Sequence, residues 1–146
     1  MNSLILPLVV GTGGFVGAVL RHYVTLGVTR VTGSDHSFVG TLTVNLIGCF
    51  AIGVLTTLSN RAHISPMMHR YLITGLLGSL TTFSTFGLDV VNLLQAGRST
   101  AAIISVTMNV LPGLLLVWLG LTVADRWLPP SAHEQHTDSH VEPVNS

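Results

Sequence analysis

Four long apolar segments, at about residues 4–28, 38–58, 71–94 and 101–124, leave this chain little room for anything except membrane-spanning helices. A helix needs about 20 predominantly apolar residues to cross the hydrocarbon core of a bilayer, and each segment reaches that length. Charged residues make up 8% of the chain, whereas a soluble domain has about 25%. We therefore predict an all-α membrane protein in which four transmembrane helices form one domain over residues 1–128.

The connections between the segments are too short to fold by themselves, and the chain beyond the fourth segment is polar. A pair of prolines ends the helical pattern at residue 129, and no periodicity follows it. We predict that residues 129–146 form a disordered tail. Three histidines in this tail could suggest a metal site, but no helix would hold their rings in a fixed geometry: His133, His136 and His140. A solvated tail is the interpretation we prefer.

The positive charges are almost balanced between the two sides of a four-helix arrangement. The chain has no lysine. With both termini on one side, that side carries Arg61, Arg70 and Arg126, and the other carries Arg30 and Arg98. Orientation in the membrane follows the Lys/Arg excess in short loops, so an excess of one barely selects a side. The residues alone leave two outcomes open: insertion in both orientations, with an antiparallel dimer as product, or insertion in one.

The first segment contains a charge, Arg21, on a ridge of small residues. Gly13, Gly17 and Arg21 follow at intervals of four and therefore share one face of a helix. Small residues at this spacing let a second helix approach closely. We expect the ridge to pack against a neighbouring helix, with Arg21 bonded to carbonyls or a carboxylate. An Arg21 that only extends to the membrane surface is the alternative.

Polar side chains also interrupt the second and fourth segments. Asn45 shares a helix face with Thr41, and Ser105 and Asn109 lie four apart in the fourth segment. Amides inside the bilayer commonly form hydrogen bonds between helices. They can also donate N–H groups to an anion in a pore. The residues alone do not decide between these two uses.

The third segment contains the most unusual stretch, Gly-Ser-Leu-Thr-Thr-Phe-Ser-Thr-Phe-Gly at residues 78–87. Polar, glycine-bounded backbone at bilayer depth is tolerated only where it is buried in protein or lines a wet cavity. Glycine lowers helix propensity, and the threonine pair offers competing hydrogen bonds to the backbone. We predict that the third helix is broken near mid-membrane, between Gly78 and Thr82. Carbonyl oxygens released by a break are good ligands for a small hard cation such as Na⁺.

Two phenylalanines follow the expected break. Phe83 and Phe86 are three apart and share a helix face. The edge of an aromatic ring is positive, so the pair could meet an anion edge-on; ordinary packing is the alternative. One turn beyond Phe86, Asp89 is a second charge inside the membrane. Arg21 or a hydroxyl is its expected partner.

Three motifs occur together in this chain. They read Gly-Gly-Phe-Val-Gly-Ala-x-x-Arg at 13–21, Gly-Thr-Leu-x-Val-Asn-x-x-Gly-Cys-Phe at 40–50 and Gly-x-x-Gly-Ser-Leu-Thr-Thr-Phe-Ser-Thr-Phe at 75–86. In this combination the sequence resembles the Fluc family of fluoride channels, also called CrcB. The resemblance covers all four segments and excludes the tail. It implies a dual-topology homodimer of antiparallel four-helix subunits in the bacterial inner membrane, which exports fluoride passively through two pores.

The resemblance also assigns roles to single residues. It implies that Phe83 and Phe86 line the pore, that Asn45 coordinates the anion, and that Gly78 and Thr81 supply main-chain oxygens to a structural Na⁺ between the subunits, which is not transported. Hydroxyls and a second amide would complete the fluoride path: Thr82, Ser84, Thr85, Ser105 and Asn109. Relatives often have a tyrosine where this chain has Ser105, so the fourth helix departs from the pattern. Arg21, Asp89, Gly13 and Gly17 would be structural.

Two other classes remain to be distinguished from a channel. A small proton-coupled drug exporter also has four helices, but by resemblance it needs a glutamate within its first helix, which this chain lacks. A membrane anchor for a larger complex would use the polar ridges only for packing. The segments contain no nucleotide-binding loop, no catalytic Ser or Cys with a base, and no His/Cys cluster, so no enzyme is expected. Fluoride, lipid and a second copy are the expected partners, and nucleic acid is not.

Overall fold

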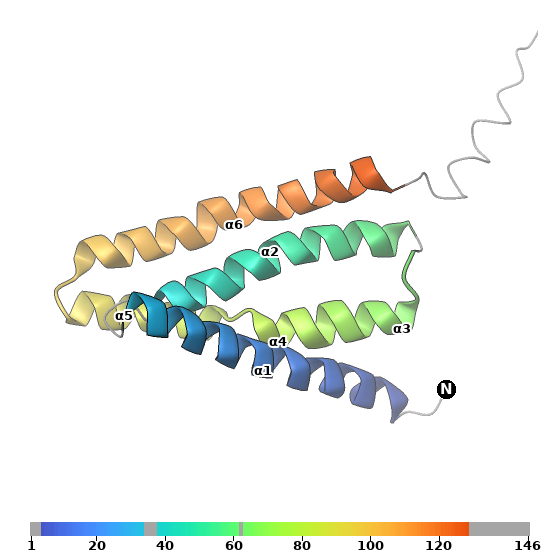
Figure 1. Cartoon of the computed structure of the whole chain (residues 1–146), viewed down its shortest axis with the longest axis horizontal. Helices are drawn as coiled ribbons and strands as arrows, with labels where there is room; N and C mark the ends of the chain where they lie inside the picture. The colour runs from blue at the N-terminus through green and yellow to red at the C-terminus, as the bar shows by residue number, and fades with distance from the viewer. Residues whose placement is uncertain (1–3, 34–37, 62, 129–146) are drawn as a thin grey trace, which may run out of the picture.

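The computed structural model describes residues 4–33, 38–61 and 63–128, and these ranges are helical apart from short turns. In chain order the helices are α1 (Ile5–Thr32), α2 (Phe38–Asn60), α3 (Pro66–His69), η2 (Arg70–Leu77), α4 (Gly78–Leu80), α5 (Phe83–Gln95) and α6 (Ser99–Trp127), where η2 is a π-helix. They form an elongated bundle (Figure 1). The tail predicted for residues 129–146, with its three histidines, lies outside the described residues.

Four helical stretches are long and apolar enough to cross a membrane, as the sequence predicts. They are Ile5–Thr32, Phe38–Asn60, Pro66–Gln95 and Ser99–Trp127. The third stretch combines α3, η2, α4 and α5. Each stretch extends beyond its predicted segment at one or both ends, because the polar residues that flank an apolar segment continue its helical hydrogen bonding.

Glycines allow α1 to cross η2 at very short range. A Cβ atom at Gly13 would overlap the carbonyl oxygen of Tyr71, and one at Gly17 would overlap that of Leu76. The approach is mutual, because a Cβ at Gly75 would lie 3.1 Å from the Cα of Gly13. The ridge of small residues on α1 therefore packs directly against the backbone of η2.

The contact between α2 and α6 follows the same principle and runs along both helices (Figure 1). A Cβ at Gly53 would lie 2.9 Å from the backbone nitrogen of Leu121, and one at Gly120 would lie 3.0 Å from that of Val54. At the end of the pair, Arg61 forms an ion pair of 2.9 Å with Asp125. Through these contacts α2 and α6 pack closely along their length, and the third span lies against α2.

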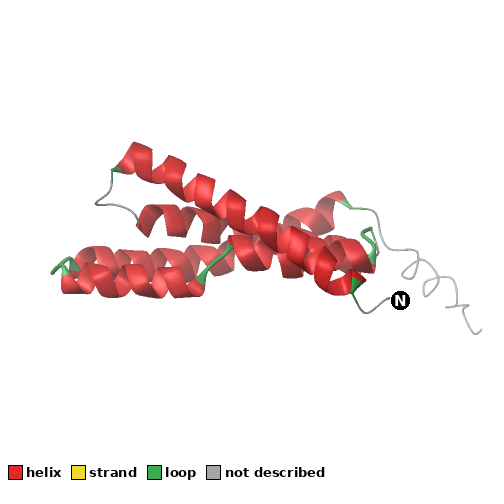
Figure 2. Cartoon of the chain, turned by 90° about the horizontal axis from the view of Figure 1, so that it is seen from below, coloured by secondary structure: helices red, strands yellow, loops and turns green. Residues whose placement is uncertain are grey.

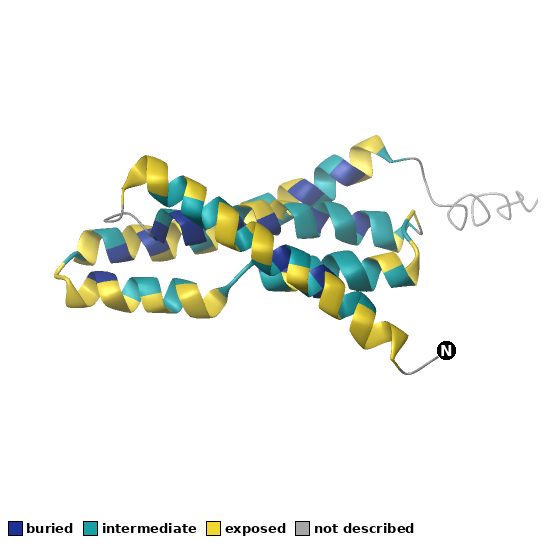
Figure 3. Cartoon of the chain, turned by 60° about the horizontal axis from the view of Figure 1, so that its bottom comes forward, coloured by how far each residue is buried: buried dark blue, intermediate teal, exposed yellow. Residues whose placement is uncertain are grey.

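The bundle buries few large side chains of its own. Two small apolar clusters form its core: Phe38 with Leu93 and Ala102, and Val44 with Leu77 and Leu80. Exposed residues follow the outer sides of the helices (Figure 3), and many of them are large and apolar. Such a surface is stable only against lipid or another protein, which agrees with a membrane location.

Candidate functional site

The third span changes its backbone conformation at two threonines. Thr81 (φ −80°, ψ 154°) and Thr82 (φ −152°, ψ 120°) are extended, and they separate α4 from α5. Figure 2 shows them as a short loop segment between two helices, in the middle of the molecule. The Thr82 hydroxyl accepts a hydrogen bond of 3.2 Å from the Thr85 backbone nitrogen and so caps α5. We call Thr81 and Thr82 the extended pair.

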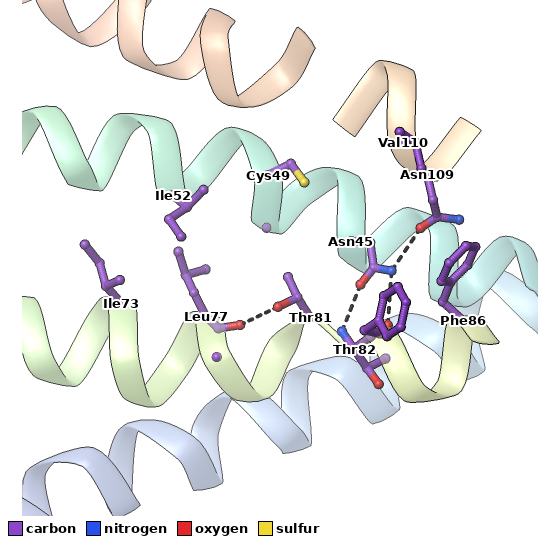
Figure 4. Close-up of a pocket in the computed structure, with 13 residues that line it drawn as sticks. Asn45, Cys49, Ile52, Ile73, Leu77, Thr81, Thr82, Phe86, Asn109 and Val110 are labelled. Atoms are coloured by element: carbon purple, nitrogen blue, oxygen red, sulfur yellow. Dashed lines mark hydrogen bonds between the residues drawn. The ribbon is translucent and has the colours of Figure 1, made fainter. Parts of the chain in front are cut away.

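Asn45 of α2 binds the backbone of the extended pair with its side-chain amide (Figure 4). Its Oδ1 accepts from the backbone nitrogen of Thr82 at 2.9 Å. Its Nδ2 donates to the Thr82 carbonyl oxygen at 3.3 Å and to Oδ1 of Asn109 at 2.9 Å. Asn109 in turn donates from Nδ2 to the Ser105 carbonyl oxygen at 2.9 Å. Both hydrogens of the Asn45 amide are thus engaged within the protein.

A cavity of about 380 Å³ lies beside the extended pair. Asn45, Thr81, Thr82, Phe83, Phe86 and Asn109 line it together with apolar residues of α2, η2 and α6. The ring centroids of Phe83 and Phe86 are 5.6 Å apart, and their planes are tilted by 57°. Phe86 is half-buried, whereas Phe83 is 82% exposed. The two rings thus line a cavity that also contains amide side chains, threonine hydroxyls and apolar walls.

A second cavity, of about 440 Å³, contains Arg21. Five threonines line it with Arg21: Thr25, Thr29, Thr41, Thr82 and Thr85. Because Thr82 also lines the first cavity, the extended pair borders both cavities through this residue. Thr25 and Thr29 were not among the predicted site residues, although their spacing of four from Arg21 places all three on one helix face.

The two intramembrane charges do not bind each other. The Thr41 hydroxyl donates to Oδ2 of Asp89 at 2.7 Å, so the partner of Asp89 is a hydroxyl. Within residues 4–33, 38–61 and 63–128, Arg21 makes neither a hydrogen bond nor an ion pair; the carbonyl or carboxylate partner expected for it is not found there. Arg21 faces the second cavity instead.

The remaining candidate residues lie at different depths. Thr82 is joined through its hydroxyl to Ser84 at 3.3 Å and to Thr85 at 3.1 Å, and both partners are exposed at the start of α5. Ser105 is 1% exposed, and it does not line either cavity next to the extended pair. Its carbonyl orients Asn109, which does reach the first cavity.

Main-chain oxygens around the extended pair are available to a cation. In a continuous helix the Thr82 N–H would bond to the Gly78 carbonyl, but here it bonds to Asn45. In the described part of the chain, the carbonyl oxygen of Thr81 accepts no hydrogen bond, and that of Gly78 does not receive the Thr82 N–H. The same ranges contain no group of three His, Cys, Asp or Glu side chains placed to hold a metal. A cation bound here would therefore use backbone oxygens, and the residues fit such a site.

Comparisons with known proteins give one family. The family model described as "CrcB-like protein, Camphor Resistance (CrcB)" matches residues 8–121. The chain is 44% identical over 113 residues to a protein of Shewanella sp. (strain W3-18-1) named fluoride-specific ion channel FluC. The aligned region covers 77% of this chain and 90% of the relative. It is 41% identical over 122 residues to a protein of the same name from Hydrogenovibrio crunogenus, covering 83% and 92%.

Proposed function

This chain belongs to the CrcB family of multi-pass bacterial membrane proteins, and from that premise we propose that it is a fluoride channel of the inner membrane. It is a transport protein and not an enzyme. We propose that fluoride leaves the cell passively, down its own gradient, without a coupled ion or fuel. The observation that carries this proposal is the extended pair, which borders two cavities and is held there by an amide.

The chemistry of the two cavities supports an anion as the substrate. Fluoride is small and strongly hydrated, so a pore must replace its water with hydrogen-bond donors and exclude the larger chloride by width. The second cavity offers a positive charge, Arg21, and several hydroxyls. The first is lined by the rings of Phe83 and Phe86, whose edges are positive, and by the amide of Asn109. An anion near Asn45 would compete for the hydrogen that Asn45 donates to Thr82 at 3.3 Å, the longer of its two donated bonds.

We further propose an antiparallel homodimer with a structural Na⁺ at its interface. Gly78 and Phe83 are exposed in the single chain, and a second copy would cover them. The carbonyl oxygens of Gly78 and Thr81 from both subunits would hold the ion, which supplies a fixed positive charge that favours anion entry. The nearly balanced arginines permit the opposite insertion of the two copies.

Fluoride efflux from liposomes tests the function. Purified protein is reconstituted into liposomes loaded with potassium fluoride and some sodium salt, with valinomycin to carry the compensating charge. We expect a fluoride electrode to record rapid efflux without a proton gradient, and none from protein-free liposomes. Efflux only under a proton gradient would indicate a coupled exporter. No efflux would favour an anchoring role, and either result would overturn the proposal.

Removal of sodium is expected to reduce the efflux rate by about tenfold or more. An ion that binds only the active form of the dimer, at a concentration of about ten times its Kd, raises the population of that form by about this factor. The measurement is the initial efflux rate after complete replacement of Na⁺ by N-methylglucamine, followed by restoration of Na⁺. Thr81→Ser leaves the main-chain oxygen in place and should reduce the rate less than sodium removal does. An unchanged rate in the sodium-free sample would contradict the cation site.

A further inference from the structure

We infer that Asn45 is a positioning residue: its amide holds Thr82 in the extended conformation and thereby releases the Gly78 carbonyl from the helix. Its position on α2 brings it to the extended pair from a separate helix, 37 residues away in the chain. The effect of Asn45 on sodium binding rests on the proposed function. Its role in holding Thr82 extended does not, so the two can be tested separately.

Asn45 takes the place of hydrogen bonds that the backbone of Thr82 would make in a helix. The Thr82 N–H would close a helical turn by donating to Gly78, and the oxygen of Asn45 takes that donor at 2.9 Å. The same amide also donates to the carbonyl of Thr82 at 3.3 Å. One side chain thus satisfies both backbone groups of a residue that has left the helix, which stabilises the interruption.

Asn109 of α6 determines the orientation of the Asn45 amide. Asn109 donates from Nδ2 to the Ser105 carbonyl, so its oxygen must face Asn45. Oδ1 of Asn109 can only accept a hydrogen bond, so Asn45 must present its Nδ2 to Asn109. Oδ1 of Asn45 then faces the Thr82 N–H. This chain of hydrogen bonds starts on α6, which is packed firmly against α2. Asn109 therefore keeps Asn45 in the orientation that binds the extended pair.

Thr81, the other member of the extended pair, also packs against α2. A Cβ at Gly48, one turn beyond Asn45 on α2, would overlap the Cγ2 methyl of Thr81. The missing side chain leaves the space that this methyl occupies. One face of α2 thus accommodates both residues, with Asn45 on the backbone of Thr82 and Gly48 against the side chain of Thr81.

These contacts change how Asn45 contributes to transport. Because both hydrogens of its amide are engaged within the protein, Asn45 acts on transport through the geometry of the extended pair. Without Asn45, the Thr82 N–H can return to the Gly78 carbonyl and remove an oxygen from the proposed cation site. Asn45 is therefore expected to determine the sodium affinity of the channel.

The structural test uses the full-length protein in detergent micelles and needs no fluoride. We expect Asn45→Ala to move the Cα and Cβ chemical shifts of Thr81 and Thr82 away from extended values, and the Thr82 amide to exchange with solvent at a changed rate. Thr43→Val is the matched control, because the Thr43 hydroxyl bonds only within α2, to the Val39 carbonyl at 2.8 Å. It should leave all these signals unchanged. Wild-type shifts and exchange at Thr82 in Asn45→Ala would overturn the inference.

A second variant covers the case in which Asn45→Ala does not fold. Asn45→Asp keeps an oxygen for the Thr82 N–H, so Thr82 should retain its extended shifts. If Asn45→Asp also loses them, the accepted N–H is not what holds the pair, and the inference fails.

The functional test measures the sodium concentration that gives half-maximal fluoride efflux. It is expected to rise about tenfold in Asn45→Ala, the factor that one buried hydrogen bond is worth, and to stay at the wild-type value in Thr43→Val. An unchanged sodium dependence in a folded Asn45→Ala would contradict the cation part of the inference. If the wild-type protein conducts no fluoride, the proposed function fails, whereas the spectroscopic result still decides the structural claim.

Discussion

Phe86→Ile is expected to lower the fluoride efflux rate by up to about tenfold while the protein remains folded. Phe86 lines the first cavity, half-buried, with its ring centroid 5.6 Å from that of Phe83. Isoleucine fills a similar volume but has no positive ring edge. A favourable edge contact is worth up to about 1.5 kcal/mol, which is roughly a factor of ten in rate. Phe83→Ile is expected to have an effect of the same kind, because both rings would face the ion.

The measurement is the initial efflux rate in liposomes, normalised to the amount of folded protein. Phe15→Ile is the matched control: Phe15 is an aromatic residue of α1 that is 72% exposed and borders neither cavity beside the extended pair. It should retain the wild-type rate. Rates near wild type in both Phe83→Ile and Phe86→Ile would exclude an electrostatic role for the rings and leave packing as their function.

Gly17→Ala is expected to destabilise the fold severely, by about 3 kcal/mol or more. A single methyl at this buried position of α1 would overlap the carbonyl oxygen of Leu76, which belongs to the backbone of η2 and cannot rotate away. The two helices would have to separate. Because η2 leads directly into α4 and the extended pair, the site would be displaced with it.

Gly27→Ala provides the control for that experiment. Gly27 lies in the same helix, but a Cβ there has no atom within 4 Å. Since alanine favours a helix by about 0.8–1 kcal/mol over glycine, Gly27→Ala should be neutral or stabilising. Thermal midpoints and the folded fraction in size-exclusion chromatography give the comparison. A Gly17→Ala variant as stable as wild type would show that α1 and η2 are not packed backbone to backbone.

The four membrane spans could be predicted from the sequence because their signal is local. A run of about 20 apolar residues needs no partner to be recognised, and the described residues confirm the four helical stretches. The spacing of Gly13 and Gly17 likewise predicts a closely packed ridge, since residues four apart always share a helix face. What this ridge touches is not local, and the sequence did not identify η2 as its partner.

The hydrogen-bond partners of the polar residues inside the spans could not be predicted from local sequence patterns. From the sequence, Asp89 could bind Arg21 or a hydroxyl; the structure pairs it with Thr41, 48 residues away. A bond expected for Arg21 is not found among the described residues, because Arg21 faces a cavity. A charge can be located in a segment from the sequence, but its partner depends on which helix lies opposite.

Asn45 shows the division most clearly. The sequence by itself determined that an amide lies inside the second span and that the third span contains residues of poor helix propensity, because both are properties of short stretches of chain. Only the tertiary structure decided how the amide is used: its partners, Thr82 and Asn109, are 37 and 64 residues away and reach it from two other helices. An amide has two donors and one acceptor group with no preference among them, so its partners are set by the packing of the helices around it.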